Sequence, residues 1–134
     1  MFYAQLTAIG FYLICLFQLA LVFGAPWGEY TQGGGTKGKL GRAGRIGAAV
    51  SIVILLIMSQ AILATRGQGL FIGLPGWLLE TLKWATFVYS VLGVIMNWAS
   101  RSPKERMVWG PIASVLAVLI PLAIFWLSEI NGNH

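Results

Sequence analysis

Residues 46–65 read IGAAVSIVILLIMSQAILAT, an uninterrupted apolar stretch without a single charged residue. Such a stretch forms a helix about 30 Å long, which matches the hydrocarbon thickness of a bilayer. Three further stretches have the same length and character: residues 2–23, 76–98 and 107–128. Within the four stretches, only Glu80 and Lys83 are charged. The sequence therefore predicts an all-α fold, a membrane-spanning antiparallel four-helix bundle.

The connections between these stretches are short, which limits the domain organisation. They run over about 20, 10 and 8 residues, and the chain is 57% hydrophobic and 10% charged. No separate soluble domain fits into such connections. Residues 1–134 are therefore expected to form one transmembrane domain. The first stretch is interpreted as a span because it lacks the basic segment that begins a signal peptide.

The basic residues favour one side of the predicted membrane. Seven occupy the first and third connections: Lys37, Lys39, Arg42, Arg45, Arg101, Lys104 and Arg106. The other side holds Arg66, with Lys83 just inside the membrane. Because loops rich in Lys and Arg stay in the cytoplasm, we expect these two connections to be cytoplasmic and both termini extracytoplasmic. The net charge of +5 follows from this bias, so nucleic acid is not expected as a partner.

Residues that build reactive centres are scarce. Cys15 is the one cysteine and lies within the first stretch, and His134 is the one histidine. No Cys/His cluster has ligand spacing, so neither a metal nor another cofactor is expected. Residues 33–39 read GGGTKGK, but Leu40 stands where a phosphate-binding loop needs Ser or Thr, and no strand precedes it. No nucleophile has an adjacent base, so we identify no catalytic residue and favour an enzyme least.

The third stretch carries polar and small residues at helical spacing. They follow one another at intervals of three and four: Lys83, Thr86, Ser90, Gly93 and Asn97. These positions share one face of a helix, which we expect to pack against neighbouring helices. A polar pocket along the same face is the alternative.

The fourth stretch repeats this pattern. Its small residues at similar spacing are Gly110, Ser114, Ala117, Pro121 and Ser128. We expect this face to pack against other helices as well. Pro121 should also free the Ala117 carbonyl and bend the helix.

Polar residues gather at the two ends of the predicted bundle, and its central slab has no ionisable group. The candidate binding cluster at the cytoplasmic end comprises Trp27, Glu29, Arg45, Asn97, Glu105 and Arg106, with Gln18 at similar depth. We expect Glu29 to pair with Arg45 or Arg106, because unpaired charges in the membrane interface are costly. Asn97 should bond to a neighbouring loop. This network should hold the glycine-rich first connection over the mouth of the bundle.

A second candidate binding layer lies at the outer end and comprises Glu80, Lys83 and Glu129. Glu80 and Lys83 are three residues apart on a helix, so we expect them to pair. In the third connection, residues 102–105 read SPKE, a capping box with proline at the first helical position. This motif predicts that the fourth helix begins there.

Two groups of residues in the connections carry a family resemblance. Residues 24–31 read GAPWGEYT, and a Gly33-Gly34 pair, Leu40 and Arg45 follow. The second half adds Asn97, Ser100, Ser102-Pro103, Glu105-Arg106 and Trp109-Gly110-Pro111. With these residues the chain resembles a family of small bacterial four-span integral membrane proteins of unassigned function. The resemblance implies a place in the bacterial cytoplasmic (inner) membrane and a functional surface at the cytoplasmic ends of the helices.

Two classes of function fit these observations. The first is a non-catalytic membrane module that acts through helix packing and its cytoplasmic polar loops, with a larger membrane protein or a second copy as partner. The alternative is a binder or transporter of a lipid or small amphipathic molecule. Membrane lipids surround the protein in either case. A cavity wider than helix packing requires would favour the second class.

Overall fold

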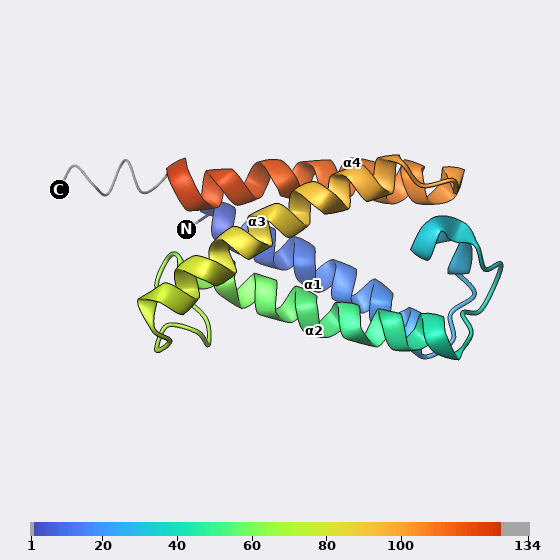
Figure 1. Ribbon diagram of the computed structural model, residues 1–134, viewed down its shortest axis with the longest axis horizontal. Helices are drawn as coiled ribbons and strands as arrows, with labels where there is room; N and C mark the ends of the chain where they lie inside the picture. The colour runs from blue at the N-terminus through green and yellow to red at the C-terminus, as the bar shows by residue number, and fades with distance from the viewer. Residues whose placement is uncertain (1, 127–134) are drawn as a thin grey trace.

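The computed structural model describes residues 2–126 (Figure 1). Its long helices are α1 (Phe2–Val22), α2 (Arg42–Ala64), α3 (Gly76–Trp98) and α4 (Pro103–Pro121). Shorter helical turns are η1 (Gly28–Tyr30), η2 (Gln32–Gly34) and the π-helical η3 (Leu122–Trp126). No strand occurs in this part of the chain, and all four long helices are apolar enough to cross a membrane. The predicted all-α, four-helix fold of a multi-pass membrane protein is confirmed.

The helices are arranged antiparallel, in two closely packed pairs. α1 packs most extensively along α2, and α3 packs along α4. In Figure 1 the α1–α2 loop and the α3–α4 turn lie at one end of the bundle, and the α2–α3 loop lies at the other. The end with the α1–α2 loop and the α3–α4 turn is called the basic end, because the seven cations of the first and third connections belong to it. The end with the α2–α3 loop is called the terminal end.

The core is built mainly from three of the four helices. Its buried residues include Phe11 of α1, Leu55 and Ile62 of α2, and Ile120 of α4. α3 contributes little, because only 11% of its apolar segment is buried, against 33% for α2. In Figure 1, α3 crosses the bundle obliquely and diverges from α2 towards the basic end. Most residues of α3 are therefore only partly buried or exposed.

The expected packing face of α3 is only partly realised. Thr86 and Ser90 are buried, yet their hydroxyls donate to carbonyls of their own helix. A Cβ added to Gly93 would meet no atom within 4 Å. The expectation that this face packs against a neighbouring helix is therefore wrong at Gly93, because this part of α3 faces open space.

Small residues do permit close approach elsewhere. A Cβ on Gly110 of α4 would lie 3.0 Å from the ring of Trp98, and the Trp98 indole N–H donates to Ser114 Oγ at 2.9 Å. The expected packing of the Gly110 and Ser114 face is thus confirmed against α3. Between α1 and α4, a Cβ on Gly10 would lie 2.6 Å from Leu116.

Helix α4 has a specified start and an altered end. Ser102 Oγ accepts a hydrogen bond from Glu105 N, and Pro103 occupies the first turn, so the predicted helix start is confirmed. After Pro121, which has no N–H to continue the α-helical pattern, the chain forms the π-helical turn η3. Arg66 donates to the Ala123 carbonyl of this turn. Ser128 lies outside the described residues.

Candidate functional site

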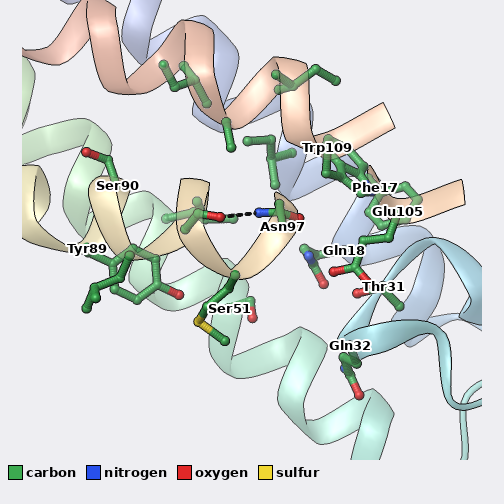
Figure 2. A pocket seen from close by; sticks show the side chains of 18 of the residues that line it. Phe17, Gln18, Thr31, Gln32, Ser51, Tyr89, Ser90, Asn97, Glu105 and Trp109 are labelled. Atoms are coloured by element: carbon green, nitrogen blue, oxygen red, sulfur yellow. Dashed lines mark hydrogen bonds between the residues drawn. The ribbon is translucent and has the colours of Figure 1, made fainter. Parts of the chain in front are cut away.

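A cavity of about 460 Å³ lies between the four helices towards the basic end of the bundle (Figure 2). All four long helices and residues 30–33 of the first loop line it. Native helix packing leaves few voids larger than a water molecule, whereas ligand pockets range from roughly 300 to 1,000 Å³. We refer to this cavity as the pocket.

The deep walls of the pocket are apolar. Four of the lining residues belong to the core of the bundle, and Ile112 extends the same surface; the four are Phe11, Leu55, Met58 and Leu116. Along α4 the lining runs from Glu105 to Leu116, which corresponds to about 16 Å of helix and roughly half of the hydrocarbon thickness of a bilayer. A hydrocarbon chain matches these walls in polarity and in depth.

The rim of the pocket faces the side of the bundle. Tyr89, Leu92 and Met96 of α3 line the pocket and are nevertheless 45%, 51% and 71% exposed. These side chains lie where α3 diverges from α2, and Figure 2 places Tyr89 and Ser51 on facing helices. The pocket therefore opens laterally, towards the region that membrane lipids occupy.

Ser51, Tyr89 and Ser90 contribute hydroxyl groups along the sides of the pocket. Most of the other polar groups lie at the end of the pocket nearest the basic end. They comprise Gln18 of α1, Thr31 and Gln32 of the loop, Asn97 of α3, Ser100, and Glu105 of α4. In Figure 2 the Glu105 carboxylate extends towards Gln18. We refer to this polar end, which the first loop covers, as the mouth of the pocket. The pocket thus combines an apolar interior with a polar mouth, the arrangement that binds amphipathic molecules.

Glu105 is the charged residue of this mouth. It is 9% exposed, and its Oε2 accepts hydrogen bonds from Gly33 N and from Ser100 Oγ, each at 2.9 Å. Within residues 2–126, Glu105 makes no ion pair and its Oε1 has no hydrogen-bond donor. Its place in the first turn of α4 stabilises the negative charge through the helix dipole. The carboxylate therefore keeps one oxygen available to a bound molecule.

Glu105 also differs from the expected capping box. In that motif the glutamate side chain accepts from the backbone N–H of the capping serine. Here Ser102 N donates to Ser100 Oγ instead. The Glu105 carboxylate bonds to the first loop, because Gly33 approaches it at the mouth of the pocket.

Two amides at the mouth have unused hydrogen-bonding capacity. Asn97 Nδ2 donates to the Gly93 carbonyl at 2.7 Å, and the described part of the chain supplies no donor to its Oδ1. The predicted bond from Asn97 to a neighbouring loop is wrong, because the side chain folds back along its own helix. Gln18 lines the pocket and makes no hydrogen bond to any residue between 2 and 126.

The glycine-rich loop is held over this mouth by hydrogen bonds from several segments. Ser102 Oγ donates to the Glu29 carbonyl at 2.5 Å, and Gln32 Nε2 donates to the Gly44 carbonyl at 2.8 Å. Within the loop, Gly28 N donates to the Gly38 carbonyl. Together with the Gly33–Glu105 bond, these contacts fold the loop against α2 and α4.

Gly34 shows why glycine is needed in this loop. Its φ of +71° is in the left-handed region, which side chains disfavour. An added Cβ would also lie 2.4 Å from the Cβ of Ser102. Docking of the loop on the start of α4 therefore depends on the absence of a side chain at position 34.

The charged residues of the predicted cytoplasmic cluster find other partners than expected. Glu29 pairs with Lys104 at 2.5 Å, so its predicted pairing with Arg45 or Arg106 is wrong. The Lys104 hydrogen bond and charge lower the pKa of the Glu29 carboxyl below its ordinary value. Lys104, at the start of α4, reaches this loop, whereas the two arginines are engaged elsewhere.

Both arginines bind backbone carbonyls where a helix ends. Arg45 donates to the Val22 carbonyl through Nε at 2.8 Å and Nη2 at 2.5 Å, at the last residue of α1. Arg106 Nη1 donates to the Ser100 carbonyl at 2.5 Å, just beyond α3. Helix C-terminal carbonyls lack internal donors and carry partial negative charge, which explains this choice of partner.

The six residues of the predicted cluster therefore separate. Asn97 and Glu105 line the pocket. Trp27 stacks on Phe17 of the pocket wall, with ring centroids 5.8 Å apart. Glu29, together with Lys37, Arg101 and Lys104, lines a separate surface depression, and neither Arg45 nor Arg106 lines the pocket.

The lining residues that were not predicted have weak sequence signals. Gln18 is a polar residue within an apolar stretch, and its expected depth in the membrane matched that of the predicted cytoplasmic cluster. Trp109 forms an edge contact with Phe17 at 4.7 Å, and its enclosed indole N–H has no partner within the described residues. Thr31 and Ser100 belong to the motifs that carry the family resemblance, but the sequence did not place them at a pocket, because their position depends on how the loops fold.

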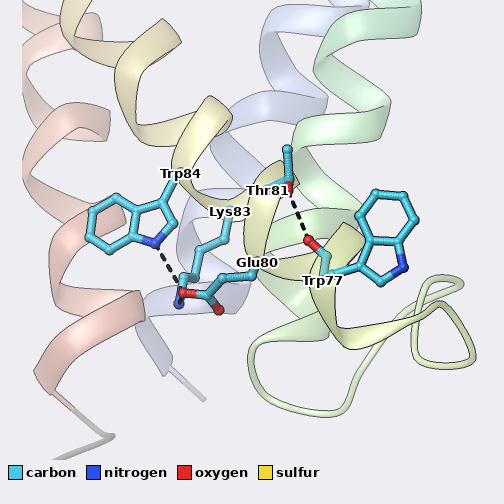
Figure 3. A network of polar contacts seen from close by, with 5 residues as sticks. All are labelled: Trp77, Glu80, Thr81, Lys83 and Trp84. Carbon is cyan, nitrogen blue, oxygen red and sulfur yellow. Dashed lines mark hydrogen bonds and ion pairs between the residues drawn. The ribbon is translucent and has the colours of Figure 1, made fainter.

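The second predicted layer forms a local network at the terminal end (Figure 3). Lys83 pairs with Glu80 at 2.8 Å, as predicted, and the Trp84 indole N–H donates to Glu80 at 3.0 Å. The Lys83 ammonium also lies 5.4 Å from the Trp84 ring centroid. Glu129 lies outside the described residues. Glu80, Lys83 and Trp84 do not line the pocket, and tryptophan at this depth is typical of a membrane interface.

Comparison with known proteins adds no further assignment. No family model, curated protein or solved structure matches this chain. The resemblance to small four-span bacterial membrane proteins stays a prediction. The chain is a helical, multi-pass membrane protein with a laterally open pocket.

Proposed function

We propose that this protein binds a single-chain amphipathic molecule in the pocket. The observation that carries the proposal is a cavity of about 460 Å³ with apolar walls and a polar mouth. The hydrocarbon chain lies against Phe11, Leu55 and Leu116, and the head group lies beside Asn97 and Glu105. This arrangement matches the opposite polarity of the two ends of such a molecule.

The lateral opening supports entry from the membrane. Tyr89, Leu92 and Met96 form a partly exposed rim on α3. The glycine-rich loop closes the pocket on the side of the basic end through the Gly33–Glu105 and Ser102–Glu29 bonds. An amphipathic molecule reaches the pocket by moving sideways from the bilayer, and its head group stays near the membrane interface.

The orientation of the chain is part of the proposal. Seven cations at the basic end, against Arg66 and Lys83 towards the other end, favour a cytoplasmic basic end. The pocket then opens into the cytoplasmic leaflet, and both termini are extracytoplasmic. The sequence resemblance described above supports a bacterial inner membrane as the location.

A membrane module that acts by helix packing alone is less favoured. It requires the small and polar face of α3 to pack against neighbouring helices. The open space at Gly93 places part of this face beside the pocket instead. Association with a second copy or a larger membrane partner remains compatible with a binding role.

The proposal is tested by photo-crosslinking with dodecanol that carries a diazirine at the end of its chain. We expect labels on Phe11, Leu55 or Met58, which line the pocket and are at most 8% exposed. Lipid-facing residues such as Val53, which is 58% exposed, report non-specific labelling. Labelled peptides are identified by mass spectrometry of protein in lipid nanodiscs.

Two glycine variants of α3 provide a matched comparison. Gly93 lines the pocket and Gly76 does not, and a Cβ added at either position meets no atom within 4 Å, so Gly93→Leu adds its side chain at the pocket and Gly76→Leu adds the same side chain away from it. We expect Gly93→Leu to abolish labelling of the pocket and Gly76→Leu to preserve it. Equal pocket labelling in both variants, or labelling of exposed residues alone, would contradict the proposal.

A further inference from the structure

We infer that the pocket selects a head group that donates hydrogen bonds and carries no negative charge, a hydroxyl or a protonated amine. The inference rests on the proposed function and specifies the chemical class of its ligand. It follows from the charge that lines the mouth and from the hydrogen-bond acceptors there that have no donor. It also follows from the nearby cations, which are bound to other groups of the protein.

The charge at the mouth of the pocket is negative, whereas the connections that surround it are positively charged. Seven Lys and Arg residues belong to the connections at the basic end, yet none lines the pocket, and Glu105 is the one charged lining residue among residues 2–126. Arg45 and Arg106 are bound to backbone carbonyls, and Lys104 is paired with Glu29. A phosphate or carboxylate head would meet the Glu105 charge without an arginine or lysine to neutralise it.

The environment of Glu105 makes the binding of an anionic head group beside it unfavourable. The carboxylate is buried, so its repulsion of a second negative charge is weakly screened by water. Binding sites for phosphate and carboxylate groups usually supply Arg, Lys or several free N–H groups. Gly33 N, a backbone N–H at this mouth, is already bonded to Glu105. Within the described part of the chain, the Gln18 amide and the Trp109 indole supply free N–H groups to the lining, but both are uncharged and do not offset the Glu105 charge.

The unused acceptors define what the head group must offer. Glu105 Oε1 and Asn97 Oδ1 both lack a donor within residues 2–126. An ionised carboxylate accepts hydrogen bonds only, and the Asn97 amide oxygen does the same. A hydroxyl or ammonium group supplies the missing donors. The unpaired Gln18 amide adds a donor and an acceptor beside them.

Four probes with the same alkyl chain test the inference: dodecanol, dodecylamine, dodecanoate and dodecyl phosphate. Each competes with the diazirine-bearing dodecanol for labelling of the pocket in nanodiscs of uncharged lipid. We expect dodecanol and dodecylamine to compete at concentrations at least about tenfold lower than the two anions, a factor that corresponds to about 1.4 kcal/mol. If only one of dodecanol and dodecylamine competes in this way, the inference holds. The probe that competes then shows whether the pocket selects a hydroxyl or an ammonium group.

Two variants locate the source of the selectivity. Glu105→Gln removes the charge and nearly preserves the shape, so it should reduce the discrimination against dodecanoate and dodecyl phosphate. Glu80→Gln makes the same change in a residue that does not line the pocket, and it should leave the order of the probes unchanged. If Glu105→Gln does not fold, the order of the four probes with the unchanged protein still decides.

The failure of this inference is distinguishable from failure of the proposed function. If the anionic probes compete as well as dodecanol while Gly93→Leu still abolishes labelling, the pocket binds amphipathic molecules and the inferred head-group selectivity is wrong. If the diazirine-bearing dodecanol does not label the pocket of the unchanged protein, the proposed function fails, and the inference fails with it.

Discussion

Glu105 acquires its role from contacts that its place in the sequence only partly predicts. The pattern Ser102-Pro103 followed by Glu105 correctly predicted the start of α4. The hydrogen bond from Gly33, 72 residues away in the chain, was not predictable, because it depends on the folded loop. The same applies to Glu29, whose need for a cation was correctly anticipated and whose partner, Lys104, was not.

At this scale, Gly34 provides a direct test of how the loop is held. Alanine at position 34 forces a side chain into the left-handed region, which costs about 1–2 kcal/mol, and brings its Cβ against Ser102. Alanine at position 38 meets the same backbone cost at φ +76° but has open space. We expect the Gly33 amide to exchange its hydrogen roughly tenfold faster in Gly34→Ala than in Gly38→Ala. Equal exchange rates in the two variants would show that the contact with Ser102 does not hold the loop.

At the scale of the elements, the apolar stretches predicted the helices closely. The first stretch, residues 2–23, corresponds to α1 (Phe2–Val22), and residues 76–98 correspond to α3 (Gly76–Trp98). α2 begins four residues before its apolar stretch, at Arg42, because a helix can continue through charged residues that reach the membrane interface. The packing of α3 was not predictable. A polar helix face indicates that this face is turned away from lipid, but it does not specify whether a neighbouring helix or a pocket lies opposite.

The orientation of the elements is testable with single cysteines, because Cys15, the one native cysteine, is buried. Gly35 at the basic end and Gly73 at the terminal end are both exposed and have no atom within 4 Å of an added Cβ. In intact cells, a membrane-impermeant thiol reagent should label Gly73→Cys at once and Gly35→Cys only after permeabilisation. The reverse pattern would place the basic end outside the cell and contradict the proposed orientation.

At the scale of the whole molecule, the pocket follows from unequal packing of the two helix pairs. α1 and α2 form the better buried pair, and α3 diverges from α2 towards the basic end, where the loop covers the space between the helices. The sequence predicted four spans, their antiparallel order and a polar cytoplasmic end. It left open whether the polar face of α3 packs or lines a pocket, because that depends on the angle between helices.

The central claim is that a hydrocarbon chain occupies the pocket, and the methyl groups of two methionines test it most directly. Met58 lines the pocket and is 5% exposed, whereas Met107 is 78% exposed and does not line it. With dodecanol in deuterated-lipid nanodiscs, nuclear Overhauser effects from its chain protons should reach the Met58 methyl. They should disappear in Gly93→Leu and persist in Gly76→Leu. Contacts to the Met107 methyl with none to Met58 would show that the chain lies only on the outer surface of the protein.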